Sequence, residues 1–416
     1  MNKLTVVPAT ERNVAVGYLR AFVTLLVIAH HSALAYHPYA PPPAASLSAE
    51  PMLWQAFPVV DSQRWAGVDV FVGFNDVFFM SLMFLVSGLF VWPSLQRKGP
   101  GRFLSERLRR LGIPFLVAAG LFAPLAYFPA YLQTGAGVDP GAFWRVWLSL
   151  PHWPSGPAWF LWMLLAFDAV AAALTRAAPG WGSALGRVVG RAQRPAQFFW
   201  LLVAISAVAY LPLAVGLDPG RWVSFGPFSF QVSRPLLYAA YFFAGAGLGA
   251  FGLSDGLLGA GQRLARRWAV WASSAVLAFL TTAVCFLVAL SRGPAAGKGA
   301  WAVVDATFVV SCAASSFAFL ALFTRFAHRG RVGDSLAANA YGMYITHYVF
   351  VSWLQYAFLG AALPAPAKGT LVFFGAVALS WALTAAVRRI PAVGSVISTA
   401  APTTLRRQLY GAGDHP

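Results

Sequence analysis

The sequence predicts an all-α fold, a polytopic integral membrane bundle of about ten transmembrane helices with both termini in the cytoplasm. Of its 416 residues, 59% are hydrophobic and only 10% are charged, and the mean hydropathy is +0.65. Apolar runs of about 20 residues recur along the chain, which is the length that crosses the hydrocarbon core of a bilayer. Because lipid offers no partners for open backbone groups, each run is expected to form a continuous helix.

The apolar runs and the charges between them predict the organisation of the chain. The expected spans are residues 16–36, 68–92, 112–133, 156–176, 197–216, 234–253, 268–290, 301–325, 337–358 and 368–388. Most of the 30 lysines and arginines lie in the N-terminal segment, the tail and every second loop, which the positive-inside rule assigns to the cytoplasm. We therefore expect a cytoplasmic N-terminus (1–15), one transmembrane domain (16–390) and a cytoplasmic C-terminal tail (391–416).

Composition and motifs argue against several classes of protein. The net charge of +17 follows this topology and favours contact with anionic membrane lipids, so no nucleic-acid partner is expected. Cys285 and Cys312 fall in apolar spans, where cysteine behaves as a small hydrophobe, so neither a disulfide framework nor a metal site is indicated. The sequence has no GxxxxGK[ST] phosphate loop, which disfavours a nucleotide-driven pump.

The first span, GYLRAFVTLLVIAHHSALAY, carries Arg20, His30 and His31 in an otherwise apolar run. At about 100° per residue, Arg20 and His31 share one helix face about 16 Å apart along the axis, whereas His30 points away. Thr24 and Val27 lie between them on that face. One interpretation treats the two residues separately. Arg20 is then a charge that orients the helix in the membrane, and His31 is a structural histidine that forms a hydrogen bond to another helix. Intramembrane ionisable residues are costly and typical of functional sites, so a polar line across the membrane is the alternative.

Motifs in several spans point to one family. Tyr18-Leu19-Arg20 is followed, after ten residues, by His31-Ser32. Four further stretches come in order: FFMSLMFLVSGLF (78–90), RFLSERLRRLGIPF (102–115), AWFLWMLLAF (158–167) and YGMYITHYVF (341–350). Together they resemble the membrane acyltransferase 3 family, whose signature is R-x10-H. The resemblance covers the chain from about residue 13 to about residue 390.

The resemblance implies a multi-pass O-acyltransferase of the bacterial inner (plasma) membrane. Family members move an acyl group, often acetyl, from cytoplasmic acyl-coenzyme A to an acceptor. That acceptor is frequently a hydroxyl of an envelope polysaccharide or of a lipid-linked sugar. Acyl-CoA, expected to be acetyl-CoA, is therefore the expected donor substrate, without a metal. The sequence leaves the acceptor, the acyl group and a homodimer open.

The histidine of the R-x10-H motif is regarded as catalytic in the family, which points to His31. Transfer from a thioester to a hydroxyl needs a base or a nucleophile, and imidazole, with a pKa of about 6.5, can serve as either. We assign His31 as the general base, with a covalent acyl-histidine as the second route, and we place Arg20 and Asp76 beside it in the catalytic set. Asp76, at a similar depth in the second span, is expected to orient His31 as a triad acid does.

One position departs from the family pattern. Many members have an acidic residue three positions before the motif arginine, where this chain has Gly17. Arg20 then lacks a local carboxylate partner, and it is expected to meet a donor phosphate or a lipid instead.

A strongly basic connection between the second and third spans is a candidate donor site. Arginine forks bind phosphate oxygens bidentately, and coenzyme A carries phosphates. Positive-inside charge and lipid headgroup contact explain the same residues without a ligand. Small residues at the end of the second span allow either a pantetheine arm or another helix to approach. The candidates are Arg102, Arg107, Arg109, Arg110, Ser87 and Gly88, of which Arg107 and Arg109 resemble an R-x-R element of the family.

The ninth span carries Tyr341, Tyr344 and His347, which are expected either to line the path of the substrate or to form hydrogen bonds between helices. Asp168 in the fourth span is another intramembrane acid, but the sequence names no partner for it. Mid-membrane histidines and aspartates also suit a proton-coupled transporter of a sugar or acyl compound, which is the alternative function. Against a transporter, no inverted repeat and no matching pair of broken spans is visible.

Overall fold

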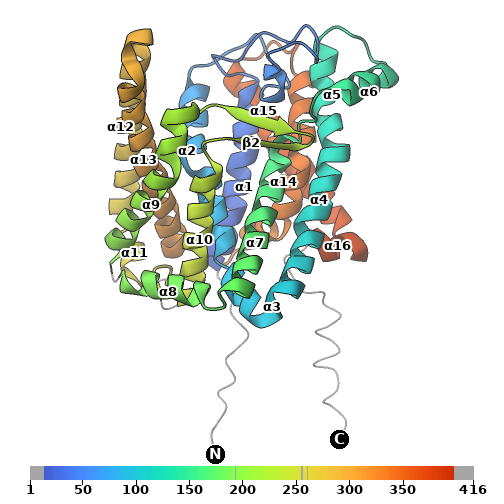
Figure 1. The fold of residues 1–416 in the computed structure, drawn as a ribbon. Coiled ribbons are helices and arrows are strands. Elements are labelled where there is room, and N and C mark those ends of the chain that lie inside the picture. The colour runs from blue at the N-terminus through green and yellow to red at the C-terminus, as the bar shows by residue number, and fades with distance from the viewer. Residues whose placement is uncertain (1–13, 193, 254–255, 260, 398–416) are drawn as a thin grey trace, which may run out of the picture.

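The computed structural model describes residues 14–192, 194–253, 256–259 and 261–397, which form a bundle of long helices (Figure 1). The longer helices are α1 (Val14–Leu34), α2 (Gly67–Gly88), α3 (Val91–Arg107), α5 (Ala123–Gln133), α7 (Trp159–Ala177), α9 (Pro195–Leu217), α10 (Pro235–Phe251), α12 (Trp268–Ser291), α13 (Gly297–Phe326), α14 (Arg331–Ala357) and α15 (Ala365–Val387). The shorter ones are α4 (Ile113–Val117), α6 (Pro140–Ser149), α8 (Trp181–Arg191), α11 (Arg263–Arg266) and α16 (Pro391–Ile397).

In the described part of the chain, eight helical segments are long and apolar enough to cross a membrane. They are Val14–Leu34, Gly67–Gly88, Val91–Gln133, Gly156–Ala177, Pro195–Leu217, Trp268–Ser291, Gly293–Phe326 and Ala365–Val387. The expected sixth span corresponds to α10, which has only 17 residues, and the expected ninth span to α14, which is long but more polar. The helical, multi-pass architecture is thus confirmed, while the count of ten and the side of the termini stay predictions.

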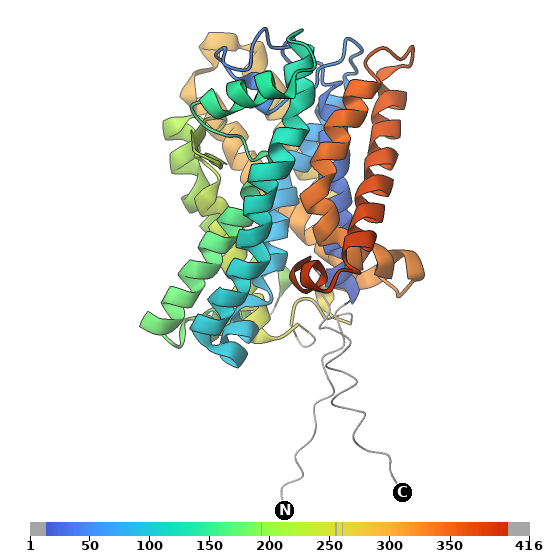
Figure 2. The same cartoon turned by 90° about the vertical axis from the view of Figure 1, so that its right-hand side faces the viewer.

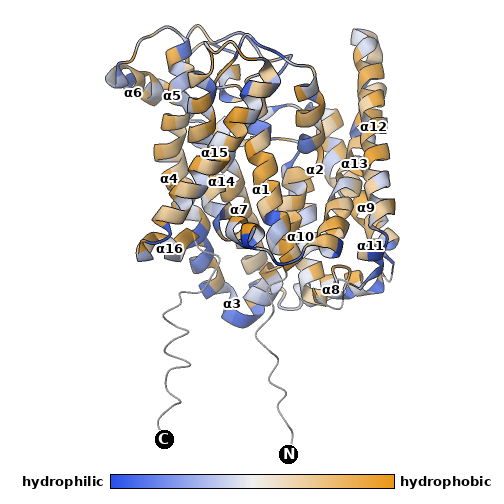
Figure 3. Cartoon of the chain, turned by 180° about the vertical axis from the view of Figure 1, so that it is seen from behind, coloured by the Kyte–Doolittle hydropathy of each residue, from blue (hydrophilic) through white to orange (hydrophobic). Residues whose placement is uncertain are grey.

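The two ends of the bundle differ. The end at which α1 begins and α16 lies is called the terminal end here, and residues 37–66 lie over the opposite end, called the loop end (Figure 2). Hydrophobic residues dominate the long helices between these ends, and hydrophilic residues gather near the ends of the helices (Figure 3). Only 17% of the apolar window of α12 is buried inside the protein, so this helix faces lipid on most of its surface.

The basic stretch after the second span is helical and does not form the expected loop. α3 runs from Val91 to Arg107 and continues through a π-helical turn (Leu108–Gly112), α4 and a second π-helical turn (Ala118–Phe122) into α5. The loop is replaced by a kink, because Gly99 has a φ of +73° and Pro100 follows it inside the helix. The arginines are therefore held on a helical scaffold at the terminal end.

Helices α2 and α10 touch backbone to backbone through glycines. A Cβ on Gly88 would lie 2.0 Å from the carbonyl oxygen of Phe242, and one on Gly245 would lie 2.0 Å from that of Leu85. Any larger side chain would push the helices apart. Gly88 is thus occupied by helix packing, which corrects its placement among the donor-binding candidates, because α10 fills the space that a pantetheine arm would need.

Residues 37–66 pack as a cap on the loop end. Trp54 is buried, and its Nε1 donates to the carbonyl of Leu47 at 3.0 Å. Gln133 of α5 exchanges two hydrogen bonds of 2.9 Å with the backbone of Val60. Asp61 forms an ion pair with Lys368 of α15 at 2.7 Å. Side-chain and backbone contacts at several points therefore attach this proline-rich segment to the helices.

A β-hairpin lies in the connection between α9 and α10. β1 (Trp222–Phe225) pairs antiparallel with β2 (Phe228–Gln231). Phe228 stacks on Phe115 of α4 with ring centroids 5.4 Å apart, and it meets the edge of Trp162 of α7. The hairpin therefore joins helices that are distant in sequence.

Candidate active site

The two histidines predicted on separate spans meet between α1 and α14. Nδ1 of His31 lies 3.2 Å from Nε2 of His347, although 316 positions separate them in the sequence. His347 is fully buried, whereas His31 is partly exposed. The other ring nitrogen of His347, Nδ1, lies 2.7 Å from the backbone carbonyl of Tyr344. The pair therefore has one end anchored on a helix backbone.

The anchor determines where the protons of a neutral pair sit. A carbonyl only accepts hydrogen bonds, so Nδ1 of His347 carries a proton and donates to Tyr344. Nε2 of a neutral His347 then has a free lone pair and accepts from Nδ1–H of His31. Nε2 of His31 is consequently left without a proton. In this arrangement, the partly exposed histidine presents a basic nitrogen.

Further contacts from α14 hold the same turn of α1. The side chain of Gln355 donates from Nε2 to the carbonyls of His31 at 2.9 Å and of Ser32 at 3.1 Å. The ring of Tyr348 meets His31 edge-on, with centroids 5.0 Å apart. Backbone and ring of His31 are thus both positioned by one neighbouring helix, which limits the orientations that its free nitrogen can take.

His30 faces a different helix, in agreement with the helical geometry of the sequence. Its ring stacks on Phe79 of α2 with centroids 5.2 Å apart. Its Nδ1 is buried and has no hydrogen-bond partner among the described residues. The adjacent histidines therefore have different surroundings, and only His31 joins the hydrogen-bonded pair.

Asp76 does not orient His31, which corrects the expected triad-like contact. Its Oδ2 lies 3.0 Å from a guanidinium nitrogen of Arg234, at the start of α10. Arg234 also packs over the ring of Phe308, 4.4 Å from its centroid. An arginine is the stronger partner for a carboxylate in such surroundings. Asp76 is therefore part of an ion pair between α2 and α10, and the place expected for it beside His31 is taken by His347.

Three arginines converge at the terminal end of α1. Arg20 is close enough to Arg107 and Arg110 to experience their charges, and Tyr341 lies beside it. Arg107 forms an ion pair of 3.2 Å with the fully buried Asp168. No described acidic side chain forms an ion pair with Arg20. The cluster therefore carries an excess of positive charge, which suits an anion.

The other two arginine candidates lie apart from this cluster. Arg102 is exposed and pairs with Glu106, which Lys98 also contacts. Arg109 is exposed as well. The structure thus brings together Arg107 and Arg110 with Arg20, and leaves Arg102 and Arg109 on the surface.

The face of α1 between the arginine cluster and His31 is closed. Thr24 is 3% exposed and Val27 is 2% exposed, because neighbouring helices cover them. The hydroxyl of Thr24 donates to the carbonyl of Arg20 at 3.0 Å. A ligand that extends from the arginine cluster to His31 would therefore need a path beside Thr24 and Val27, or a movement of the helices that cover them.

The tyrosines of α14 form hydrogen bonds between helices. The hydroxyl of Tyr341 donates to the carbonyl of Arg110, and that of Tyr344 donates to the carbonyl of Pro157. Of the two expectations for Tyr341, Tyr344 and His347, contact between helices is thus observed, and a position along the substrate path stays a prediction.

Sequence reasoning missed several contacts of this site. Gln355 had a usable signal, since a glutamine two helical turns after His347 in an apolar span must find a partner. The ion pairs of Asp168 with Arg107 and of Asp76 with Arg234 have no signal in the sequence, because they depend on how the helices pack.

Comparison with known proteins agrees with the geometry. A family model described as an acyltransferase domain matches residues 13–385, nearly the whole chain. No curated protein and no solved structure matches the chain. A multi-pass membrane bundle with this match is a membrane acyltransferase, and the chain belongs to the acyltransferase 3 family.

Proposed function

We propose that this protein moves an acyl group, expected to be acetyl, from cytoplasmic acyl-CoA to a hydroxyl of an envelope carbohydrate or a lipid-linked sugar. The inner membrane of a bacterium is the expected location. The observation that carries this proposal is the His31–His347 pair, which leaves Nε2 of His31 as a basic nitrogen. The arginine cluster on the same helix supports the choice of a donor that carries phosphates.

His31 acts as the general base in this mechanism. Its Nε2 takes the proton of the acceptor hydroxyl while the oxygen attacks the carbonyl carbon of the thioester. The carbon–sulfur bond then breaks, and the proton passes from His31 to the leaving sulfur, which gives free coenzyme A and the acyl ester. His347 stabilises the imidazolium that forms in between, because its Nε2 accepts from Nδ1–H of His31 throughout.

The donor is held at the terminal end of α1. Arg20, Arg107 and Arg110 bind phosphate oxygens of coenzyme A, for which guanidinium groups are well suited. Asp168 restrains Arg107 through their ion pair. The distance of about 16 Å along the helix from Arg20 to His31 requires an extended arm, such as that of coenzyme A, between the phosphates and the thioester.

The second chemical route uses the same nitrogen as a nucleophile. Nε2 of His31 attacks the thioester, coenzyme A leaves, and the acyl-histidine then passes its acyl group to the hydroxyl. Rapid quenching after mixing with labelled donor in the absence of acceptor separates the routes. Label bound to the protein supports the covalent route, and unlabelled protein supports the general base.

The experiment that tests the proposed function is transfer of radiolabelled acetyl groups from acetyl-CoA to glycans and lipids of membrane vesicles. We expect wild-type protein to label the membrane fraction and His31→Ala to abolish labelling at equal amounts of folded protein. His30→Ala is the matched control, because it removes a neighbouring imidazole on another helix face, and it is expected to retain activity.

Two outcomes contradict the proposal. Full labelling by the His31→Ala variant would show that His31 is not the general base. Uptake of a sugar or acyl compound into vesicles, without covalent labelling in the wild type, identifies a transporter instead.

A further inference from the structure

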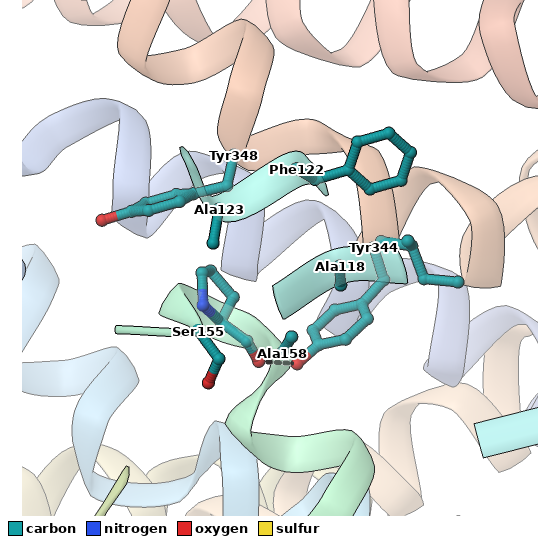
Figure 4. Close-up of a pocket in the computed structure, with 9 residues that line it drawn as sticks. Ala118, Phe122, Ala123, Ser155, Ala158, Tyr344 and Tyr348 are labelled. Atoms are coloured by element: carbon teal, nitrogen blue, oxygen red, sulfur yellow. Dashed lines mark hydrogen bonds between the residues drawn. The ribbon is translucent and has the colours of Figure 1, made fainter. Parts of the chain in front are cut away.

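A small cavity lies between α14, the helix formed by α4 and α5, and the segment before α7 (Figure 4). Its lining is mainly apolar and includes residues with small side chains. Figure 4 shows Ser155 and Ala158 from the loop together with Tyr344 and Tyr348 from α14. The lining includes Ala118, Phe122, Ala123, Ser155, Ala158, Tyr344 and Tyr348.

Ser155 is a buried residue of this segment whose side-chain hydroxyl is unpaired in the part of the chain that the structure describes. It is 4% exposed, and its hydroxyl has no hydrogen-bond partner among the described residues. An unpaired buried hydroxyl is unfavourable by about 1–3 kcal/mol, and a catalytic role is one of the reasons for which native proteins keep such a group. Ser155 lines the cavity, where a bound group with an acceptor oxygen would satisfy it.

A 3₁₀ turn, Gly156–Ala158, follows Ser155 and lies against α14. Gly156 has a φ of +53°, and a Cβ at this position would lie 3.1 Å from the ring of Tyr348. Only glycine combines this conformation with such a close approach. The next residue, Pro157, accepts a hydrogen bond from the hydroxyl of Tyr344. Two consecutive residues thus hold Ser155 at a fixed position relative to α14.

The same two tyrosines connect the cavity to the histidine pair. The ring of Tyr348 lines the cavity and also meets His31 edge-on at 5.0 Å. The side chain of Tyr344 lines the cavity, and its backbone carbonyl anchors His347. The π-helical turn Ala118–Phe122 forms part of the opposite wall, and such turns are frequent at functional sites.

We propose that this cavity holds the acyl group of the donor and that Ser155 donates a hydrogen bond to its carbonyl oxygen. This inference rests on the proposed acyl transfer. As the acceptor oxygen adds to the carbonyl carbon, negative charge develops on that carbonyl oxygen, and the Ser155 hydroxyl stabilises it. When the carbon–sulfur bond breaks, the carbonyl re-forms, and the hydroxyl of Ser155 keeps its own proton.

The volume of the cavity then determines which acyl groups are transferred. Alanines at 118, 123 and 158 leave room for a short chain, and Phe122 is the phenylalanine of the lining. One methylene group more or less in an apolar pocket changes the specificity about 10–200-fold. The protein is therefore a short-chain acyltransferase whose upper limit is set by these side chains.

The test compares acetyl-, propionyl-, butyryl- and hexanoyl-CoA as donors to membrane acceptors. Phe122→Ala, which enlarges the cavity, is expected to raise the ratio of butyryl to acetyl transfer about tenfold or more, and Ala123→Val, which fills it, to lower that ratio similarly. Ala130→Val is the matched control, since Ala130 is equally buried on the same face of α5 but does not line the cavity. It should leave the ratio unchanged.

Ser155 is tested by its effect on turnover. Ser155→Ala is expected to lower kcat about 100-fold with little change in KM for the donor, as observed when one oxyanion donor is removed. Ser155→Thr keeps the hydroxyl and is expected to restore most of the loss. A kcat equal to that of the wild type in Ser155→Ala overturns the role of Ser155.

The chain-length series separates this inference from the proposed function. If wild-type protein transfers acetyl groups but neither Phe122→Ala nor Ala123→Val changes the chain-length ratio, the cavity does not hold the acyl group. If the wild type transfers no acyl group from any donor, the proposed function itself fails.

Discussion

Two pairs of polar side chains, Asp61 with Lys368 and His31 with His347, connect distant parts of the chain in different ways. Asp61 and Lys368 are each 1% exposed and lie 2.7 Å apart, and both find further partners. Lys368 also donates to the carbonyl of Leu359, and Asp61 accepts from the backbone N–H of Gln63. In the His31–His347 pair, Nδ1 of His347 is anchored on the carbonyl of Tyr344, and His31 also meets the backbone of Val27. The hydrogen bond between the two rings uses Nδ1 of His31 and not its Nε2.

The comparison teaches that burial alone does not identify a functional site. An ion pair whose charges are neutralised and hydrogen-bonded has no capacity left for a substrate, and its contribution is structural. A chain of neutral imidazoles that ends in an unpaired nitrogen keeps a basic group at a defined position. We therefore expect the first pair to affect folding and the second to affect turnover.

The largest expected effect is on stability. Lys368→Met leaves the buried carboxylate of Asp61 without its partner, which is expected to lower the free energy of unfolding by about 3–5 kcal/mol. Thermal unfolding of the purified protein in detergent measures it. The double variant Asp61→Asn with Lys368→Met should recover part of the loss, because no buried charge remains. An unchanged unfolding temperature in the single variant would contradict the structural role.

The next effect separates the two pairs. His347→Leu removes the acceptor of the His31 proton, so we expect kcat to fall about 100-fold with little change in KM for the donor. His347→Gln offers a carbonyl oxygen in the same region and is expected to restore part of the activity. Steady-state kinetics of label transfer gives both values. Equal activity of the Leu and Gln variants would show that the hydrogen bond to His31 is irrelevant.

A smaller effect concerns the donor. Arg20→Gln removes one of the three clustered guanidinium groups, which is expected to raise KM for acyl-CoA about tenfold, since hydrogen bonds to charged groups contribute about 1.5–3 kcal/mol. Arg102→Gln is the matched control, because Arg102 is exposed and paired with Glu106 outside the cluster. An equal KM for both variants would contradict donor binding by Arg20. The arginines would then serve only the membrane topology or contact with lipids.

The smallest effect is a dependence of stability on pH at the loop end. Partial burial lowers the pKa of His37 below its ordinary value of 6.5, although Asp69 opposes the shift. The unfolded chain then binds a proton more readily, so stability is complete above pH 6.5 and declines as the pH falls through the lowered pKa. Unfolding temperatures between pH 8 and pH 5 measure this decline, and His37→Gln should reduce it.

The sequence predicted the fold more fully than the site. The apolar runs predicted the helices, because each helix must satisfy its own backbone in lipid. The helical period separated His30 from His31 and aligned His31 with Arg20, since that information lies within one helix. The family resemblance, carried by the same motif, is confirmed by the match over residues 13–385.

The sequence patterns did not predict which side chains meet between helices. His347 was expected near the middle of its span, but its partner depends on which face of α14 packs on α1. Asp76 was assigned to His31 by its depth alone, and depth does not distinguish His31 from Arg234. Arg102, Arg107, Arg109 and Arg110 are close in sequence, yet a helix distributes them around its circumference and turns only some of them toward Arg20.

The central claim is that Nε2 of His31 is the unprotonated nitrogen because His347 accepts the proton on Nδ1. Nitrogen NMR of protein labelled with ¹⁵N-histidine measures this directly, and the spectrum of His31→Gln identifies the His31 signals among those of the seven histidines. We predict for His31, at neutral pH, a protonated Nδ1 and an unprotonated Nε2. A spectrum in which Nε2 of His31 carries the proton and Nδ1 does not would contradict the account.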